Sequence, residues 1–189
     1  NVGADADSTK QVLYMQQGGL TLPDVSYYTD SAHASKLEAF TTFMVNVLVM
    51  VGASREEARA SADSVVEVES ALAAMHLSHE DERAARSLPP LSVQQVSRGM
   101  AMPGGFDWSL LFTLMEVPSS SSDKVVRVID VGYFSKLCAF LAERTPRSLV
   151  PYVRWRYLDA LMGHLGKEFQ AQDLSFRRVL FGVSRAPPR

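Results

Sequence analysis

The sequence predicts a mostly α fold in which long helices run antiparallel and a small two-stranded β ribbon accompanies them. Two observations lead to this class. Apolar residues recur at spacings of three and four over several long segments, as they do along the buried stripe of a helix. β-prone residues are concentrated in only two short segments, residues 10–15 and 124–129. A ribbon of two strands is marginally stable alone, so we expect it to lie on helices.

The length of the chain indicates one domain, because 189 residues with 47% hydrophobic residues bury about one core. We expect residues 1–29 to supply an N-terminal strand and a loop. Residues 30–189 then form a helical lobe that packs with them as one compact unit. The sequence has no start methionine and no leader pattern, which is typical of a piece of a longer protein.

The first elements are a strand and a shaped loop. Lys10–Met15 is β-prone through its Val, Leu and Tyr residues. Residues 17–24 follow with two glycines, which permit a positive φ, and a proline, which interrupts regular structure. We therefore expect a loop there and no continuous helix.

Two long helices follow, joined by a short connection. Asp30 or Ser31 caps the first, which continues to Val51 and ends at Gly52. Ser54 and Glu57 form a capping box that starts the second. The predicted buried stripes are Leu37, Phe40, Met44, Val47, Leu48 and Val51 on the first helix, and Ala58, Ala62, Val65, Val68, Leu72 and Met75 on the second.

The rest of the chain alternates short and long helices around the second strand. Short helices are expected over residues 78–86, from residue 92, and over residues 107–116, and the strand over residues 124–129. A helix over residues 131–143 comes next. Thr145 and Pro146 then start a long helix, and a final helix ends at Phe181 before Gly182. The inner face predicted for the long helix is Val153, Tyr157, Ala160, Leu161, Leu165 and Phe169.

Charge and hydropathy exclude two classes of partner. The net charge of −2 lacks the basic excess of a nucleic-acid binder, so we expect no nucleic acid. Residues 31–116 hold 11 acids and 6 bases, and residues 144–189 hold 3 acids and 9 bases, which favours packing of one half on the other. The most apolar run, residues 43–51, is interrupted by Asn46 and is far shorter than the roughly 20 residues of a membrane-spanning helix, so no membrane segment is expected here.

A metal site is the chemistry that the residues suggest most directly, and they do not complete it. His79 and Glu80 begin the H-E-x-x-H pattern, in which two histidines one helical turn apart bind zinc, but Arg83 occupies the second histidine position. His76 lies nearby without a third ligand, and a solvated helix junction is the plainer interpretation. Cys138, the sole cysteine, falls in an apolar helical pattern typical of a buried thiol. We therefore expect no catalytic residue and no metal ligand in this chain.

Glu69 is the carboxylate with the most unusual position, because its neighbours on the predicted helix are buried. A buried glutamate needs a partner. The basic residues Arg154 and Arg156 are the candidates for a buried ion pair with it. A ligand contact by Glu69 is the alternative.

The order of the segments carries a family resemblance. The sequence QGGLTLPDVSYY, residues 17–28, resembles the Q-G-G-L-x-L-P-D-x-x-Y-Y pattern of the neprilysin and endothelin-converting-enzyme family of zinc metallopeptidases. VVEVESALA with Glu69, GFDW, VVRVIDVGYFSKL, YVRWRYLDAL and FRRVLFGVSRAPPR follow in the family's order. The residues that carry the pattern form a loop expected to be structural or to face a chamber: Gln17, Gly18, Gly19, Leu20, Leu22, Pro23, Asp24, Tyr27 and Tyr28.

The resemblance implies a secreted or membrane-anchored zinc endopeptidase with two lobes. This chain matches the N-terminal, mostly helical lobe, which would limit access to a chamber. Zinc and the catalytic residues would belong to a downstream lobe, so the partners would be that lobe and peptide substrates, in an extracytoplasmic location. The fragment alone would be inactive. After Arg83 the chain departs from the family pattern, and Cys138 has no partner cysteine here.

A second function class remains open at this point. The same helical fold could be a non-enzymatic module, derived from that family, that binds a partner protein through the loop of residues 17–28 or through the basic C-terminal helices. Sequence downstream of Arg189 distinguishes the two classes, because H-E-x-x-H with a later glutamate supports the peptidase. A lobe separated from its mate is also expected to expose an apolar interface and to self-associate.

Overall fold

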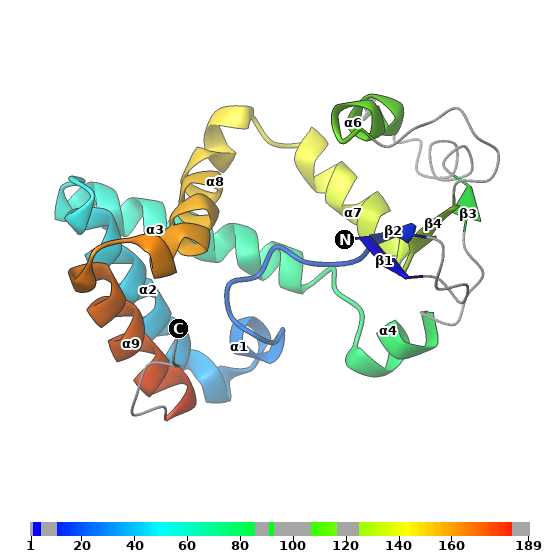
Figure 1. Cartoon of the computed structure of the whole chain (residues 1–189). Helices are drawn as coiled ribbons and strands as arrows, with labels where there is room; N and C mark the ends of the chain where they lie inside the picture. The colour runs from blue at the N-terminus through cyan, green and yellow to red at the C-terminus, as the bar shows by residue number, and fades with distance from the viewer. Residues whose placement is uncertain (1, 5–10, 86–90, 93–106, 117–124, 183–189) are drawn as a thin grey trace. The chain divides into compact units, whose positions relative to one another are not determined.

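The structure is a computed structural model that describes residues 2–4, 11–85, 91–92, 107–116 and 125–182 (Figure 1). The chain divides into two compact units. Unit 1 comprises Asn1–Gly18 and Met75–Arg144, and unit 2 comprises Gly19–Ala74 and Thr145–Arg189. This division differs from the single compact unit expected from the sequence. The reason is that the strands and the helices beside them bury their own hydrophobic cluster, separate from that of the long helices.

A sheet organises unit 1. Its strands are β1 (Val2–Ala4), β2 (Gln11–Met15), β3 (Leu91–Ser92) and β4 (Val125–Val128), in the order β1-β2-β4-β3. The central strands β2 and β4 are parallel and pair Leu13 with Val126, and each edge strand is antiparallel to its neighbour. The two predicted strands are therefore confirmed, but as the centre of a four-stranded sheet. The edge strands of two and three residues are too short to show a period-two pattern.

The described residues of unit 1 form three helices: α4 (His79–Ala85), α6 (Trp108–Leu114) and α7 (Val131–Ala142). Leu91–Ser92 is a strand where the sequence suggested a helix start, and the remainder of that predicted helix lies outside the described residues. The Asp107 side chain caps α6 by accepting from the Leu110 amide at 3.0 Å. The core of this unit is Trp108, Phe112, Val126, Tyr133, Phe134 and Cys138. Cys138 is buried, as its apolar helical pattern predicted, and its thiol is free, with a pKa that burial raises.

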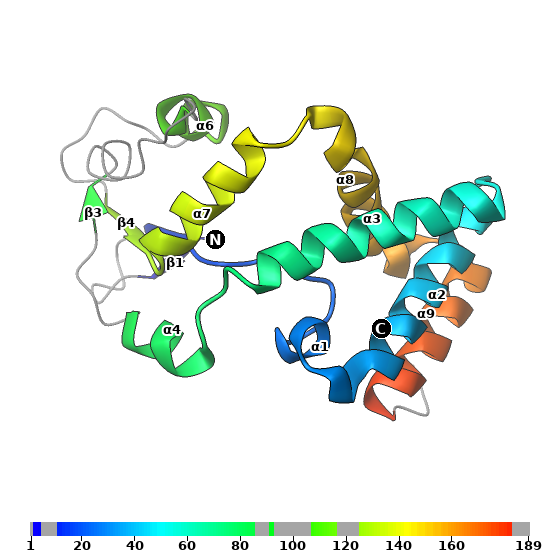
Figure 2. The ribbon, with the colours of Figure 1, turned by 180° about the vertical axis from the view of Figure 1, so that it is seen from behind.

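Unit 2 contains the long helices. They are α1 (Ser26–Thr29), the 3-10 helix η1 (Ser31–His33), α2 (Ala34–Met50), α3 (Arg55–Ala73), α8 (Pro146–Leu161), the 3-10 helix η2 (Met162–His164) and α9 (Lys167–Phe181). Helix α2 packs against both α3 and α9 (Figure 2). The mostly α class is confirmed, while the antiparallel direction of the long helices stays a prediction.

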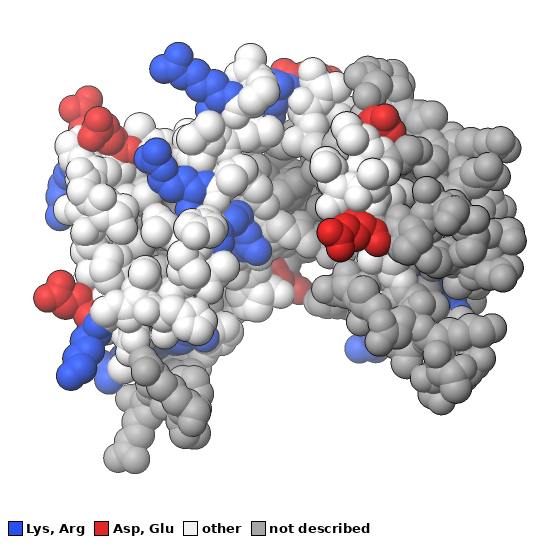
Figure 3. Space-filling model, turned by 45° about the horizontal axis from the view of Figure 1, so that its top comes forward, with Lys and Arg blue, Asp and Glu red and all other residues white. Residues whose placement is uncertain are grey.

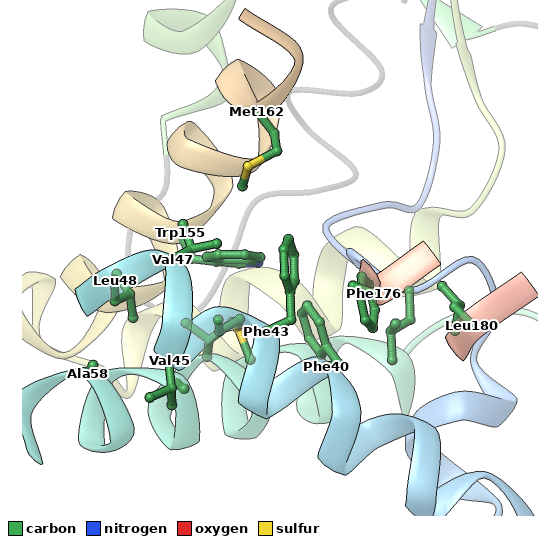
Figure 4. Packing of buried hydrophobic residues seen from close by; sticks show 14 residues of the cluster. Phe40, Phe43, Val45, Val47, Leu48, Ala58, Trp155, Met162, Phe176 and Leu180 are labelled. Atoms are coloured by element: carbon green, nitrogen blue, oxygen red, sulfur yellow. The ribbon is translucent and has the colours of Figure 1, made fainter. Parts of the chain in front are cut away.

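Aromatic side chains fill the core of unit 2 (Figure 4). Trp155 from α8 is fully buried and meets the rings of Phe40 and Phe43 edge-on, at centroid distances of 5.9 and 5.6 Å. Phe43 also stacks on Phe176 from α9 at 4.7 Å. Contacts of these kinds add to the large apolar area that each ring buries. The core thus joins α2, α8 and α9 through four rings.

Helix α8 is rotated relative to the prediction. The sequence placed Val153 and Tyr157 on its inner face, but they are 61% and 67% exposed, while Trp155 is fully buried. The indole has the largest apolar surface on this helix, so burying it lowers the free energy most. The predicted long helix also ends at Leu161, because the chain turns through η2 and Gly166 before α9 begins.

The start of α3 gives a first testable prediction. Ser54 Oγ accepts from the Glu57 amide at 3.2 Å, and the Glu57 carboxylate accepts from the Ser54 amide at 2.9 Å. We expect Ser54→Ala to lower the free energy of unfolding by about 1 kcal/mol, because the amide at the helix start loses its acceptor. Urea denaturation measures this. Ser64→Ala is the control, since that hydroxyl only bonds the Ala60 carbonyl of its own helix, and an equal loss in both variants would contradict the cap.

Candidate functional site

The loop of residues 17–28 crosses the boundary between the two units, which falls between Gly18 and Gly19. Its backbone is held by side chains from residues far away in the sequence. Residues up to Gly18 bond within unit 1, and residues from Gly19 bond within unit 2. Each side is described below on its own.

The unit 1 side of the loop is fixed by Gln17 and Gly18. The Gln17 side chain donates to the Leu77 carbonyl at 3.3 Å and accepts from the Leu77 amide at 2.7 Å. The Gly18 carbonyl accepts from the Tyr133 hydroxyl at 2.9 Å and lies 3.1 Å from Nε2 of His76. The His76 and Tyr133 rings also meet edge-on at 5.2 Å. His76 therefore contacts the loop, whereas the sequence suggested a solvated junction.

Position 19 begins the unit 2 side of the loop, and its conformation requires a glycine. Its φ of +93° lies in the left-handed region, which residues with a Cβ rarely adopt. A Cβ would also lie 2.8 Å from the Tyr152 hydroxyl and 2.9 Å from Cδ1 of Leu72. The Gly19 carbonyl accepts from that same Tyr152 hydroxyl at 2.9 Å. The absence of a side chain is what lets α3 and α8 approach the loop.

Glu69 on α3 is the centre of a buried polar network. Its side chain is fully buried. One carboxylate oxygen accepts from the Thr21 amide at 3.1 Å and from the Tyr28 hydroxyl, and the other accepts from the Thr21 hydroxyl at 2.7 Å. The Tyr28 hydroxyl accepts in turn from the Leu22 amide at 2.9 Å. Three donors thus converge on one carboxylate, all of them from the loop of residues 17–28.

Helix α8 reaches this network through Thr21. The Thr21 hydroxyl accepts from Nε1 of Trp155 and from Nη1 of Arg156, each at 3.1 Å. This arrangement replaces the direct ion pair between Glu69 and Arg154 or Arg156 that the sequence suggested. Arg154 is exposed, and Arg156 contacts Thr21 and Asp159. The Thr21 hydroxyl lies between the two side chains, since it accepts from Arg156 and donates to Glu69, and the charge of Arg156 still acts on Glu69 electrostatically.

The environment of Glu69 shifts its pKa in opposing directions. Burial is the largest influence and raises the pKa, because the charged form loses its hydration. Hydrogen bonds from Tyr28 and Thr21, and the charge of Arg156, oppose this shift without cancelling it. Burial and the nearby carboxylate also raise the pKa of Tyr28, so its hydroxyl stays protonated and continues to donate.

This raised pKa gives a prediction for pH. The folded protein holds the Glu69 proton more tightly than the unfolded chain, so the stability that it contributes is complete below about pH 4.5 and is lost as the pH rises through the raised pKa. Glu69→Gln cannot titrate. We therefore expect the stability difference, wild type minus Glu69→Gln, to shrink as the pH rises from 4 to 8. Denaturant midpoints measured across this range test it, and a difference that grows with pH would contradict it.

The remaining residues of the loop pack or form hydrogen bonds within unit 2. Leu22 lies in the core of unit 2, and Leu20 is half-buried. The Asp24 carboxylate accepts from the Ser26 amide at 2.8 Å as α1 begins, while Pro23 is exposed. Tyr27 stacks on His33 at 4.7 Å.

No metal centre is formed by the residues that the structure describes. They contain no group of three or more His, Cys, Asp or Glu side chains arranged to hold an ion. His79 and Glu80 open helix α4, and Arg83 follows one turn later with a charge that repels a cation. The donor set of zinc is therefore not matched by these residues. Nor does any described helix have the length and hydropathy to span a membrane.

Sequence reasoning missed the residues that contact the loop from a distance. Thr21 occupies an undefined position of the family pattern, so the pattern gave it no weight. Tyr152, Trp155 and Tyr133 were predicted only as parts of helices. The one available signal was chemical: a tryptophan or tyrosine that is buried needs a partner for its N–H or O–H group.

Comparison with known proteins finds similarity to peptidases along the whole chain. The sequence model described as peptidase family M13, which represents the family's N-terminal part, matches residues 1–189. Neprilysin-3 of Drosophila melanogaster is 27% identical over 94% of this chain and 24% of its own length. The endothelin-converting enzyme homolog of Locusta migratoria is 26% identical over 94% of this chain and 25% of its own length. This chain thus spans about a quarter of the curated relatives.

Solved structures share the fold. The zinc metalloprotease of Mycobacterium tuberculosis in its open state superposes with a TM-score of 0.83 and 26% identity, over 99% of this chain and 29% of that one. The same protease with an inhibitor gives 0.80 and 27%, over 99% and 28%. The fold described above is therefore that of one part of a longer protease chain.

Proposed function

This chain belongs to peptidase family M13, and from that premise we propose that it is the substrate-chamber lobe of a neprilysin-like zinc metalloendopeptidase. The observation that carries the proposal is the similarity along all 189 residues to about a quarter of such proteases. The role of the lobe is to form a helical wall that restricts entry to short peptides. Hydrolysis takes place in the remaining part of the longer protein.

The buried network around Glu69 supports a wall of fixed shape. A loop with two glycines and no regular structure is a poor boundary for a chamber unless its backbone is held. In unit 2 the Gly19 carbonyl, the Thr21 amide and the Leu22 amide each have a side-chain partner. Fixing these groups restricts the conformations of the loop and favours a constant entrance for substrate.

Zinc belongs, in this proposal, to the longer protein and not to the described residues, whose donor set does not fit it. Zinc would supply the Lewis acid and the activated water for peptide hydrolysis. The isolated 189-residue chain is therefore expected to be inactive. Its partners are the catalytic lobe of the same protein and peptide substrates, and its location is extracytoplasmic, as in a secreted protein or an ectodomain.

The test uses the longer natural protein that contains this chain. We expect it to cleave members of a broad peptide library, and 1,10-phenanthroline to abolish cleavage by removing zinc. The matched sample is the 189-residue chain alone, which should cleave nothing with or without zinc. If the longer protein cleaves no peptide under any condition, the peptidase proposal fails and the non-enzymatic interaction module becomes the better interpretation.

A further inference from the structure

An exposed apolar face runs along helix α8. Pro146, Val150, Val153 and Tyr157 follow one another at spacings of four, three and four, which places them on one side of a helix. Val150, Val153 and Tyr157 are 48%, 61% and 67% exposed. With Arg154 they line a shallow depression of about 390 Å³. We call these five residues the α8 face.

The α8 face lies opposite the part of the helix that belongs to the core. Trp155 points inward and is fully buried in the core of unit 2, whereas Val153 and Tyr157 lie outside that core. Single exposed apolar residues are ordinary on protein surfaces, but contiguous ones mark contact sites. Three such residues within eight positions of one helix form a contiguous stripe.

Charge indicates what kind of surface covers this face. The exposed positions of α8 include Arg147 and Arg154 and no acidic residue, and no described residue forms an ion pair with either arginine. In Figure 3 the end that carries α8 comes forward, and blue basic side chains are set there in a mostly white surface. Two copies of the chain paired through this face would bring arginines together, which is unfavourable. A partner with apolar side chains and a carboxylate fits better.

The length of the relatives indicates where that partner comes from. This chain covers 24% to 25% of the curated relatives and 28% to 29% of the solved protease chains. About three quarters of such a protein therefore lies outside the part matched here. A segment of that remainder is tethered to α8 and meets it at a high effective concentration, so a modest interface suffices.

We propose that the α8 face is the docking surface for a segment of the remaining chain of the longer protein, which presents apolar side chains to Val153 and Tyr157 and a carboxylate to Arg154. This inference rests on the proposed function, because it takes that remainder to be the catalytic lobe. It adds which surface of this chain the lobe contacts.

Oxidative footprinting of tyrosine, followed by mass spectrometry, tests the docking in the full-length protein and in the 189-residue chain. We expect Tyr157 to be labelled roughly tenfold more slowly in the full-length protein, since burial removes it from solvent.

A second test compares Val153→Asp on the α8 face with a control substitution at Val179 on α9, which is 56% exposed. Val153→Asp should lower the melting temperature of the full-length protein and leave that of the 189-residue chain unchanged, because it buries an unpaired charge only where the face is covered. Val179→Asp should change neither.

The outcomes separate this inference from the proposed function. If the full-length protein cleaves peptides and Tyr157 is labelled equally in both proteins, the docking inference is overturned while the peptidase stands. If the 189-residue chain dimerises in light scattering and Val153→Asp abolishes the dimer, the occupant is a second copy, which also overturns the inference. Slow labelling of Tyr157 in a full-length protein that cleaves no peptide supports the docking surface and rejects the enzyme.

Discussion

Glu69→Ala is expected to lower the free energy of unfolding by about 3 kcal/mol, since it removes the one acceptor on which three buried donors converge. The Thr21 amide, the Thr21 hydroxyl and the Tyr28 hydroxyl would remain buried without that partner. The truncation also leaves a cavity beside Thr21, whose hydroxyl accepts from Trp155 and Arg156. Denaturant unfolding followed by tryptophan fluorescence measures the loss.

Glu67→Ala is the matched control, because Glu67 lies two residues earlier on the same helix with an exposed side chain. We expect it to change stability by less than about 1 kcal/mol. A double-mutant cycle with Thr21→Val adds a sharper readout, since residues that share a network are not additive. If Glu69→Ala and Thr21→Val lower stability independently of each other, the hydrogen bonds between Thr21 and Glu69 do not stabilise the fold as described.

Gly19→Ala is expected to lower the free energy of unfolding by about 3 kcal/mol, because a left-handed backbone and a close contact act together. The φ of +93° disfavours any Cβ, and that atom would lie 2.8 Å from the Tyr152 hydroxyl and 2.9 Å from Leu72. Moving Tyr152 aside would break its hydrogen bond to the Gly19 carbonyl. Thermal unfolding of the variant measures the effect.

Gly18→Ala distinguishes this mechanism from a general intolerance of the loop. A Cβ at Gly18 meets no atom within 4 Å, and its φ is not positive. We expect a change of less than about 1 kcal/mol, or a small gain from a stiffer unfolded chain. Equal losses of stability in the two variants would show that the loop tolerates no added side chain at either position, and that the conformation of Gly19 is not the cause.

The helices of unit 2 show what a sequence pattern predicts well. The capping box at Ser54 and Glu57 is formed as expected, and most of the stripe predicted for α3 is buried. These features are local, because hydrogen bonds at a helix start and a 3.6-residue period involve residues close in sequence. Val51 shows the limit of the pattern, since it lies at the end of α2 and is 48% exposed.

The candidate site also has a part that the sequence predicted and a part that it did not. The family pattern drew attention to residues 17–28, and the buried neighbours of Glu69 on its predicted helix drew attention to Glu69 and indicated its burial. The partner of Glu69 did not follow. Thr21 and Tyr28 lie 48 and 41 residues away from it, and no sequence spacing reports a contact of that kind.

The sequence alone determined the family, the helical class, the two central strands and the buried thiol at Cys138, because each is set by a motif or by a local period. Only the tertiary structure decided that the chain forms two units, that Thr21 stands between Glu69 and Arg156, and that α8 buries Trp155 while exposing Val153 and Tyr157. These outcomes depend on which of several apolar faces meets which neighbour. The pairing of faces minimises the free energy of the whole core, so it cannot be predicted from the sequence of any one segment.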